Sequence, residues 1–333
     1  MAFGAAILGP EGLNITDWER SFFRDFKPFG FILFARNVDN PDQARRLCDD
    51  LRDAAGHDAP IMVDQEGGRV QRLRSPHWRE WLPPLEQMEQ ASDPIRAMWL
   101  RYRIIAAELR DVGIDTNCAP CADIAGRVTH PFLRNRCFGD DPLTVMDAAR
   151  TAAEAHLAGG VLPVVKHIPG HGLGSVDSHK NLPRVDATRD FLERQDFVPF
   201  RALADLPMAM TAHVVYDAID LDSPATTSEA AHYVIRHEIG FKGLLMTDDI
   251  SMEALDGSVA DRSRAALRAG CDVVLHCNGK PRELLAVSEA VGKLSGPAAF
   301  WEAKAGLHLR KTSTPVDIDA LSEEFDDLMT AVL

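Results

Sequence analysis

The chain is poor in cysteine, in basic residues and in long apolar runs. Its 333 residues include six cysteines, too few for a disulfide framework. Its 36 lysines and arginines are outnumbered by 50 aspartates and glutamates, which gives a formal net charge of −14. That balance argues against partners such as nucleic acid or an anionic membrane, because both attract clustered positive charge. No apolar run reaches the roughly 20 residues of a membrane-spanning helix. The apolar start carries no basic residue before Arg20, unlike a signal peptide, so we expect a cytoplasmic protein.

Eight short apolar runs alternate with stretches of helical periodicity along almost the whole chain. Most of these runs are continuous rather than alternating, which is typical of parallel strands that are buried on both faces. The runs are Ala5–Leu8, Gly30–Phe34, Pro60–Asp64, Asp115–Pro120, Pro163–His167, Met208–His213, Gly243–Asp248 and Asp272–His276. The pattern therefore predicts eight strands that belong to one parallel sheet.

Helix starts are marked by a capping residue followed by proline. Asn40-Pro41, Asp93-Pro94 and Asp141-Pro142 each precede a segment with helical spacing, and the last of these segments ends at Gly159-Gly160. No linker or low-complexity stretch divides the chain. We therefore predict an α/β fold, a single TIM-like (β/α)8 barrel over residues 1–333, with helices over about 297–333 packed on the barrel.

Polar residues interrupt the apolar runs at the places where the predicted strands end. In a (β/α)8 barrel the catalytic residues come from this end of the strands. Any one of these residues can be a satisfied structural group, but their recurrence after successive strands indicates a site. The residues are Asp64, Asn117, Lys166, His167, His213, Asp248, Asp249, His276, Cys277 and Asn278.

The densest motif is Lys166-His167-Ile168-Pro169-Gly170-His171-Gly172, which is followed by Asp177-Ser178-His179. A cation and an imidazole at a strand end can bind sugar hydroxyls or an anionic group. Asp177 and His179 are two residues apart, so in extended backbone their side chains lie on the same side. A carboxylate beside an imidazole suits general acid/base catalysis. The alternative is a solvated loop with incidental histidines.

Two further segments combine acids with arginines. Asp248 and Asp249 end the seventh apolar run, and one of these carboxylates should face the barrel axis as a nucleophile, a base or a metal ligand. The other can cap the following helix. Asp64 is followed by Gly67-Gly68 and by Arg72, which is typical of a ligand-binding loop, and Arg136 offers a second arginine of this kind. Either arginine can instead pair with a surface acid.

Taken together, these motifs resemble glycoside hydrolase family 3, and within it the bacterial β-N-acetylglucosaminidases of the NagZ type. The matching segments are Asp64–Val70, Lys166–Gly172, Asp177–His179 and Thr247–Met252. The third segment separates this branch from the β-glucosidases of the family. The resemblance implies a retaining β-N-acetylhexosaminidase that needs no metal or organic cofactor.

The resemblance also implies roles for individual residues. Asp248 matches the nucleophile, and His179 matches the acid/base with Asp177 as its partner in a dyad. The sugar-binding positions carry over to Asp64, Arg72, Arg136, Lys166 and His167, although Arg134 lies close enough to compete with Arg136. The implied substrate is a muropeptide that carries N-acetylglucosamine on 1,6-anhydro-N-acetylmuramic acid, as in peptidoglycan recycling. We expect the enzyme to act as a monomer.

Two other functions remain open at this point. A barrel metallohydrolase would bind one divalent ion through His167, His179, His213 and Asp248. Such sites usually begin with two histidines on the first strand, and Ala5–Leu8 has none. A carbohydrate-binding barrel without catalysis would bind a sugar and leave it intact, which the presence of Asp248, Asp177 and His179 argues against.

Overall fold

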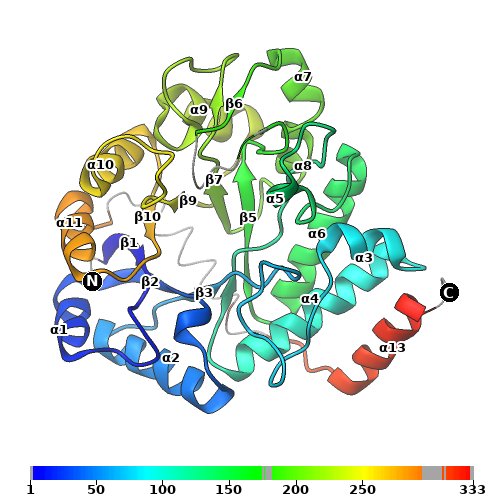
Figure 1. Ribbon diagram of the computed structural model, residues 1–333, viewed down its shortest axis with the longest axis horizontal. Coiled ribbons are helices and arrows are strands. Elements are labelled where there is room, and N and C mark those ends of the chain that lie inside the picture. Colours follow the sequence, from blue (N-terminus) through cyan, green and yellow to red (C-terminus); the bar gives the residue numbers. More distant parts are fainter. Residues whose placement is uncertain (1–2, 175, 177–181, 295–309, 311–312, 331–333) are drawn as a thin grey trace.

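A closed barrel of eight parallel strands forms the centre of the protein (Figure 1). The computed structural model describes residues 3–174, 176, 182–294, 310 and 313–330. Around the barrel the strands follow the order β1, β2, β3, β4, β5, β7, β9, β10, and β10 pairs with β1 to close the ring. The strands are β1 (Gly4–Leu8), β2 (Pro28–Leu33), β3 (Ile61–Val63), β4 (Thr116–Asn117), β5 (Leu162–Ile168), β7 (Met208–Thr211), β9 (Leu244–Asp249) and β10 (Val273–His276). Each lies on a predicted run, so the predicted TIM-like barrel is confirmed.

The fourth strand is much shorter than its apolar run. After β4 the chain still follows β5, because the amides of Val164 and Lys166 donate to the carbonyl oxygens of Ala119 and Pro120, both at 3.0 Å. Pro120 has no backbone N–H and cannot donate a hydrogen bond to β5. The regular ladder of strand hydrogen bonds therefore does not continue past β4. A separate two-stranded parallel sheet, formed by β6 (Arg184–Val185) and β8 (Val215–Tyr216), lies outside the barrel.

Helices surround the barrel (Figure 1). The predicted starts are confirmed, since Asn40, Asp93 and Asp141 each accept a hydrogen bond from the backbone of the first helical turn. The α-helices are α1 (Asp17–Phe26), α2 (Pro41–Ala55), α3 (Pro84–Gln90), α4 (Pro94–Asp111), α5 (Pro131–Arg134), α6 (Pro142–Ala158), α7 (Arg189–Arg194), α8 (Phe197–Ala202), α9 (Glu229–Tyr233), α10 (Val259–Ala269), α11 (Pro281–Val291) and α13 (Ile318–Thr330). Short 3-10 turns occupy Ala35–Asn37 and Ala225–Thr227, and a π-helix occupies Val234–Ile239. None of the helices in these described ranges has the length and apolar character needed to cross a membrane.

The C-terminal helix α13 packs against α4 at the outside of the barrel. Arg96 of α4 binds both carboxylate oxygens of Glu324, at 2.6 and 2.8 Å, and the ring of Phe325 meets the edge of Trp81 with centroids 5.2 Å apart. Helix α13 lies within the predicted C-terminal helical stretch. The start of that stretch, residues 297–309, lies outside the described residues.

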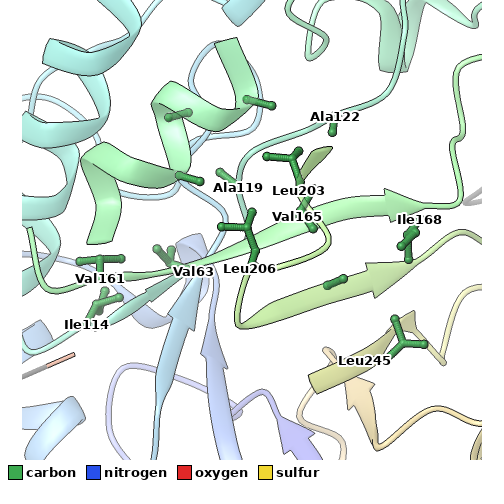
Figure 2. Close-up of a cluster of buried hydrophobic side chains, with 14 of the residues drawn as sticks. Val63, Ile114, Ala119, Ala122, Val161, Val165, Ile168, Leu203, Leu206 and Leu245 are labelled. Carbon is green, nitrogen blue, oxygen red and sulfur yellow. The ribbon is translucent and has the colours of Figure 1, made fainter. Parts of the chain in front are cut away.

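The core has two layers, which follow from the alternation of side chains along each strand. Inward side chains such as Ile32, Val164 and Met246 fill the barrel interior. Outward side chains pack against the helices, and Figure 2 shows Val165 and Leu245 of the barrel together with Leu203 and Leu206, which follow α8. Apolar side chains fill the barrel interior, and polar residues lie at the carboxyl ends of the strands.

Candidate active site

Three charged residues continue the inward-facing rows of their strands. The inward side chains of β3, β5 and β9 lie in the apolar interior of the barrel, and the last of them are Met62, Val164 and Met246. Two residues further along each strand direction, the next inward position is charged. These residues are Asp64, directly after β3, Lys166 in β5 and Asp248 in β9. Because the period of a strand is two residues, each of these side chains is directed at the same end of the barrel.

These three side chains line a cavity of about 240 Å³, which suits one small ligand. The structure brings three more predicted residues into its lining, Arg72, Arg136 and His167. The rest of the wall is largely apolar and includes Ile32, Phe34, Val70, Phe132, Leu133, Val176, Met210, Met252 and Leu275. A few converging polar groups in an apolar wall are typical of a binding site for a small molecule. Asp177 and His179 lie outside the described residues.

Asp64 is held between two cations. Its Oδ1 accepts a hydrogen bond from Lys166 Nζ at 2.8 Å, and its Oδ2 accepts one from Arg72 Nη2 at 3.1 Å. Burial raises the pKa of the Asp64 carboxyl, but the two cations outweigh burial and keep it well below its ordinary value. The loop that returns Arg72 to Asp64 turns at Gly67, whose φ is 113°, and a Cβ there would collide with the Arg101 guanidinium.

Glu66 is the main residue of the site to which the sequence assigned no role. Its side chain is 1% exposed and accepts two hydrogen bonds from Arg136, both at 2.9 Å, while Lys166 Nζ lies 2.5 Å from its Oε1. Burial raises the pKa of Glu66, but Arg136 and Lys166 lower it to about 2. Glu66 therefore stays ionised and fixes both cations toward the cavity. The only indication in the sequence was that Glu66 lies two residues after Asp64, in the loop already predicted to bind a ligand.

Replacing Glu66 by glutamine should lower the free energy of unfolding at pH 7 by about 3–5 kcal/mol, because two buried cations lose their ionised partner. The carboxylate stabilises the fold fully above its ordinary pKa of 4.5, and this contribution is lost as the pH falls toward 2. Urea unfolding from pH 7 to pH 3 should therefore show the difference between wild type and variant shrinking in acid. Glu80→Gln is the matched control, since Glu80 pairs with Arg74 at the surface and should cost at most about 1 kcal/mol. Equal losses for the two variants would contradict the buried network.

The structure also decides between the two neighbouring arginines. Arg136 lines the cavity, whereas Arg134 donates to the backbone carbonyls of Ala125 and Gly126, at 3.3 and 2.8 Å. Arg134 thus holds the backbone before the turn, and Arg136 is the one of the two that lines the cavity. The predicted residue is the one that faces the cavity.

The two acids at the end of β9 have different surroundings. Burial raises the pKa of Asp248, but the nearby imidazoles of His213 and His167 outweigh it, and the pKa lies below its ordinary value. Asp249 instead accepts hydrogen bonds from the amides of Ser251 and Cys277, at 3.0 and 3.2 Å. The expectation that one of these acids caps the next helix was wrong, because α10 starts later, at Val259, and Ser258 caps it. Both acids line the cavity. The Asp248 carboxylate accepts the amide of Asp249, at 2.7 Å, whereas the Asp249 carboxylate is bonded to Ser251 and Cys277.

Of the residues proposed for a divalent ion, the structure describes His167, His213 and Asp248, and their ligand atoms do not form a group within 4.8 Å of one another. Both ring nitrogens of His213 have other partners, since Nδ1 lies 2.7 Å from Thr226 Oγ1 and Nε2 lies 3.1 Å from the carbonyl oxygen of Asp249. Among the described residues, three ligand atoms of metal-binding type come within 4.8 Å of one another at Cys121, Asp123 and His167. That group shares only His167 with the predicted set, so the geometry does not favour the metallohydrolase.

Comparison with known proteins identifies the family. Residues 11–305 match the model of the glycosyl hydrolase family 3 N terminal domain. The chain belongs to glycosyl hydrolase family 3. The predicted resemblance and the predicted glycoside hydrolase class are therefore confirmed.

Individual proteins are similar to this chain over more than four fifths of its length. The protein is 40% identical over 286 residues to a β-hexosaminidase of Alkalilimnicola ehrlichii, which covers 84% of this chain and 82% of the relative. It is 34% identical to a β-hexosaminidase of Bordetella avium, with 83% and 81% covered. The crystal structure of NagZ from Neisseria gonorrhoeae in complex with N-trifluoroacetyl-D-glucosamine gives a TM-score of 0.84 at 29% identity, over 100% of this chain and 97% of that chain. The cavity described above is thus the candidate active site of a family 3 glycoside hydrolase.

Proposed function

We propose that the protein is a retaining β-N-acetylhexosaminidase that removes terminal N-acetyl-β-glucosaminyl residues. The observation that carries the proposal is the position of Asp248, an ionised carboxylate at the end of a barrel strand, in a cavity that suits one small ligand. The names of the family 3 relatives, β-hexosaminidase and NagZ, support the choice of an N-acetylated sugar.

In this proposal Asp248 attacks the anomeric carbon and forms a covalent glycosyl ester. Water then displaces the carboxylate, and the two displacements return the β configuration. A nucleophile of this kind must be ionised at neutral pH, and the lowered pKa of Asp248 meets that requirement. Its carboxylate accepts the amide of Asp249, at 2.7 Å, and the bonds to Ser251 and Cys277 belong to Asp249, which supports the same assignment.

His179, assisted by Asp177, is proposed as the acid that protonates the leaving oxygen and as the base that later activates water. The described carboxylates of the cavity already have other partners, since Asp64 pairs with cations and Asp249 with a loop. Val176 lines the cavity immediately before Asp177 in the chain. Asp177 and His179 follow Val176 by one and three residues in the chain.

Five residues are proposed to bind the sugar hydroxyls. Asp64 offers carboxylate oxygens as acceptors, while Arg72, Arg136 and Lys166 offer N–H donors, and His167 offers a ring nitrogen. Each cation already shares a carboxylate, so the donors are fixed before the ligand arrives. Such preorganisation lowers the entropy that binding costs.

The test compares a chromogenic N-acetyl-β-glucosaminide with the corresponding β-glucoside. We expect kcat/KM for the N-acetyl sugar to be higher by about 10²-fold, because a site built for an amide loses its polar contacts with a plain hydroxyl. A preparation of the Asp248→Asn variant controls for contaminating glycosidases. Faster turnover of the glucoside would contradict the assignment. Sugar binding without turnover would favour the carbohydrate-binding barrel.

We further propose that the natural substrate is a muropeptide ending in 1,6-anhydro-N-acetylmuramic acid, which is cleaved in the cytoplasm during peptidoglycan recycling. Support comes from the family branch and from six free thiols, which fit a reducing compartment. The basic residues of the cavity give little support for an anionic substrate, because Arg72, Arg136 and Lys166 are already paired with acids of the protein. In the same assay series, a purified anhydro-muropeptide should release N-acetylglucosamine faster than an N-acetylglucosamine disaccharide does.

A further inference from the structure

Asp123 is a buried acid bonded to His167 and His171, two residues of the main motif that line the cavity. It follows β4 on the stretch that runs beside β5, where the amide of Ala122 donates to the carbonyl oxygen of Lys166 at 2.7 Å. Its side chain is 1% exposed, and neither the motifs nor the family resemblance assigned it a role. This backbone pairing places its carboxylate directly beside the next residue of β5, His167.

Both carboxylate oxygens of Asp123 accept short hydrogen bonds. Oδ2 lies 2.6 Å from His167 Nδ1, and Oδ1 accepts from the amide of His171 at 2.6 Å. Burial raises the pKa of Asp123, but the facing His167 and His171 lower it below its ordinary value. An ionised carboxylate can only accept, so Nδ1 of His167 must carry a proton.

The other ring nitrogen of His167 lies beside Arg136, and both residues line the cavity. Nε2 lies 3.4 Å from Arg136 Nη2, and a guanidinium only donates hydrogen bonds. The neutral ring with its proton on Nδ1 satisfies both neighbours, because Nε2 then has a lone pair for Arg136 or for a sugar hydroxyl. With the proton on Nε2, two donors would face each other, so the two neighbours of the ring require the same tautomer.

We propose that Asp123 is a positioning residue, which fixes the ring and the tautomer of His167 so that Nε2 is offered to the bound sugar. This role rests on the proposed function, in which His167 contacts the substrate. The second bond of Asp123, to the amide of His171, ties the same carboxylate to the loop that leads toward Asp177. One buried acid thus supports a binding residue and the base of the loop.

Asp123→Asn isolates the effect on His167. The amide N–H groups of His171 and His167 only donate, and both lie within hydrogen-bond distance of Oδ1, at 2.6 and 3.3 Å. The asparagine oxygen therefore stays at the Oδ1 position, and its NH2 group faces His167 Nδ1. That group donates, which forces the ring proton onto Nε2. We expect kcat/KM for the N-acetyl-β-glucosaminide to fall by about 10²-fold, because a wrong tautomer or a lost supporting bond disables an otherwise intact ring. Cys121→Ala is the matched control, since it removes another hydrogen bond to Asp123 Oδ2, the one from the Cys121 thiol at 3.3 Å, and keeps the carboxylate that holds His167. It should change kcat/KM by less than about 3-fold.

A double-mutant cycle separates positioning from a general loss of structure. If Asp123 acts through His167, adding Asp123→Asn to His167→Ala should cost less than about 3-fold further. Independent losses that multiply would overturn the proposal. The ¹⁵N shifts of the His167 ring should also report the Nδ1–H form in the wild type and the Nε2–H form in Asp123→Asn. That readout needs no activity, so failure of the proposed hydrolysis is distinguishable from failure of this inference. Zinc that copurifies and is lost in Cys121→Ala would instead make the group a metal site and overturn the positioning role.

Discussion

Replacing Asp248 by asparagine should lower kcat for the N-acetyl-β-glucosaminide by about 10⁴-fold or more, with little change in stability. An amide has nearly the same shape as a carboxylate but cannot attack the anomeric carbon, so the first displacement fails. Asp249→Asn is the matched control, because it alters the neighbouring acid, which is bonded to Ser251 and Cys277. That variant should keep the covalent chemistry even if its loop is perturbed.

A 2-fluoro or 5-fluoro glycosyl donor that slows the second displacement should leave a sugar ester on Asp248. Peptide mapping of the wild type and of Asp249→Asn should find the label on the same residue. A label on Asp249 in the wild type would move the nucleophile by one position. An unlabelled protein that still forms the β product would favour attack by the acetamido oxygen of the substrate. An α product by NMR would make the enzyme inverting and Asp248 a general base.

The second large effect is expected at His179. Replacing it by alanine should slow the glycosylation step by about 10²- to 10⁴-fold for a poor leaving group, which needs protonation. A good leaving group, such as a dinitrophenolate, departs without a proton and should lose far less. An ordinary histidine titrates near pH 6.5, so at neutral pH it can act first as the acid and then as the base.

Single-turnover measurements with the two classes of leaving group test this role. His130→Ala is a useful control, because His130 also lines the cavity but uses Nδ1 to accept the amide of Phe132 at the start of α5. Any loss in that variant should be the same for both leaving groups. An equal loss in His179→Ala would show that His179 is not the acid.

Much of the fold could be predicted because its signals are local. The cap and proline at Asp141-Pro142 start α6, and the run that contains Val164 forms β5 between flanking helices. The inward orientation of Asp248 also follows from local information, because Asp248 is the next alternate residue after Leu244 and Met246 in β9. These features depend on residues two to four positions apart, which any stretch of chain contains within itself. Eight such runs separated by helices leave a closed parallel barrel as the natural arrangement.

The support of the site could not be predicted in this way. Glu66 meets Arg136 across 70 residues of sequence, and Asp123 meets His167 across 44. Nothing in a local pattern says that, of the two acids that line the cavity, Asp249 will be bonded to Ser251 and Cys277.

The sequence by itself therefore determined the barrel and the end of the strands at which the cavity lies, and its candidates include Asp64, Lys166 and Asp248, which line that cavity. Only the tertiary structure decided which charges pair, which of Arg134 and Arg136 enters the cavity, and which buried acids hold the binding residues in place. The reason is that such pairs form between neighbouring strands, and the closing of β3, β4 and β5 side by side brings together groups that are distant along the chain. Because these ions are buried, each pairing strongly affects stability: an ion removed from water is stable only when a partner of opposite charge lies beside it.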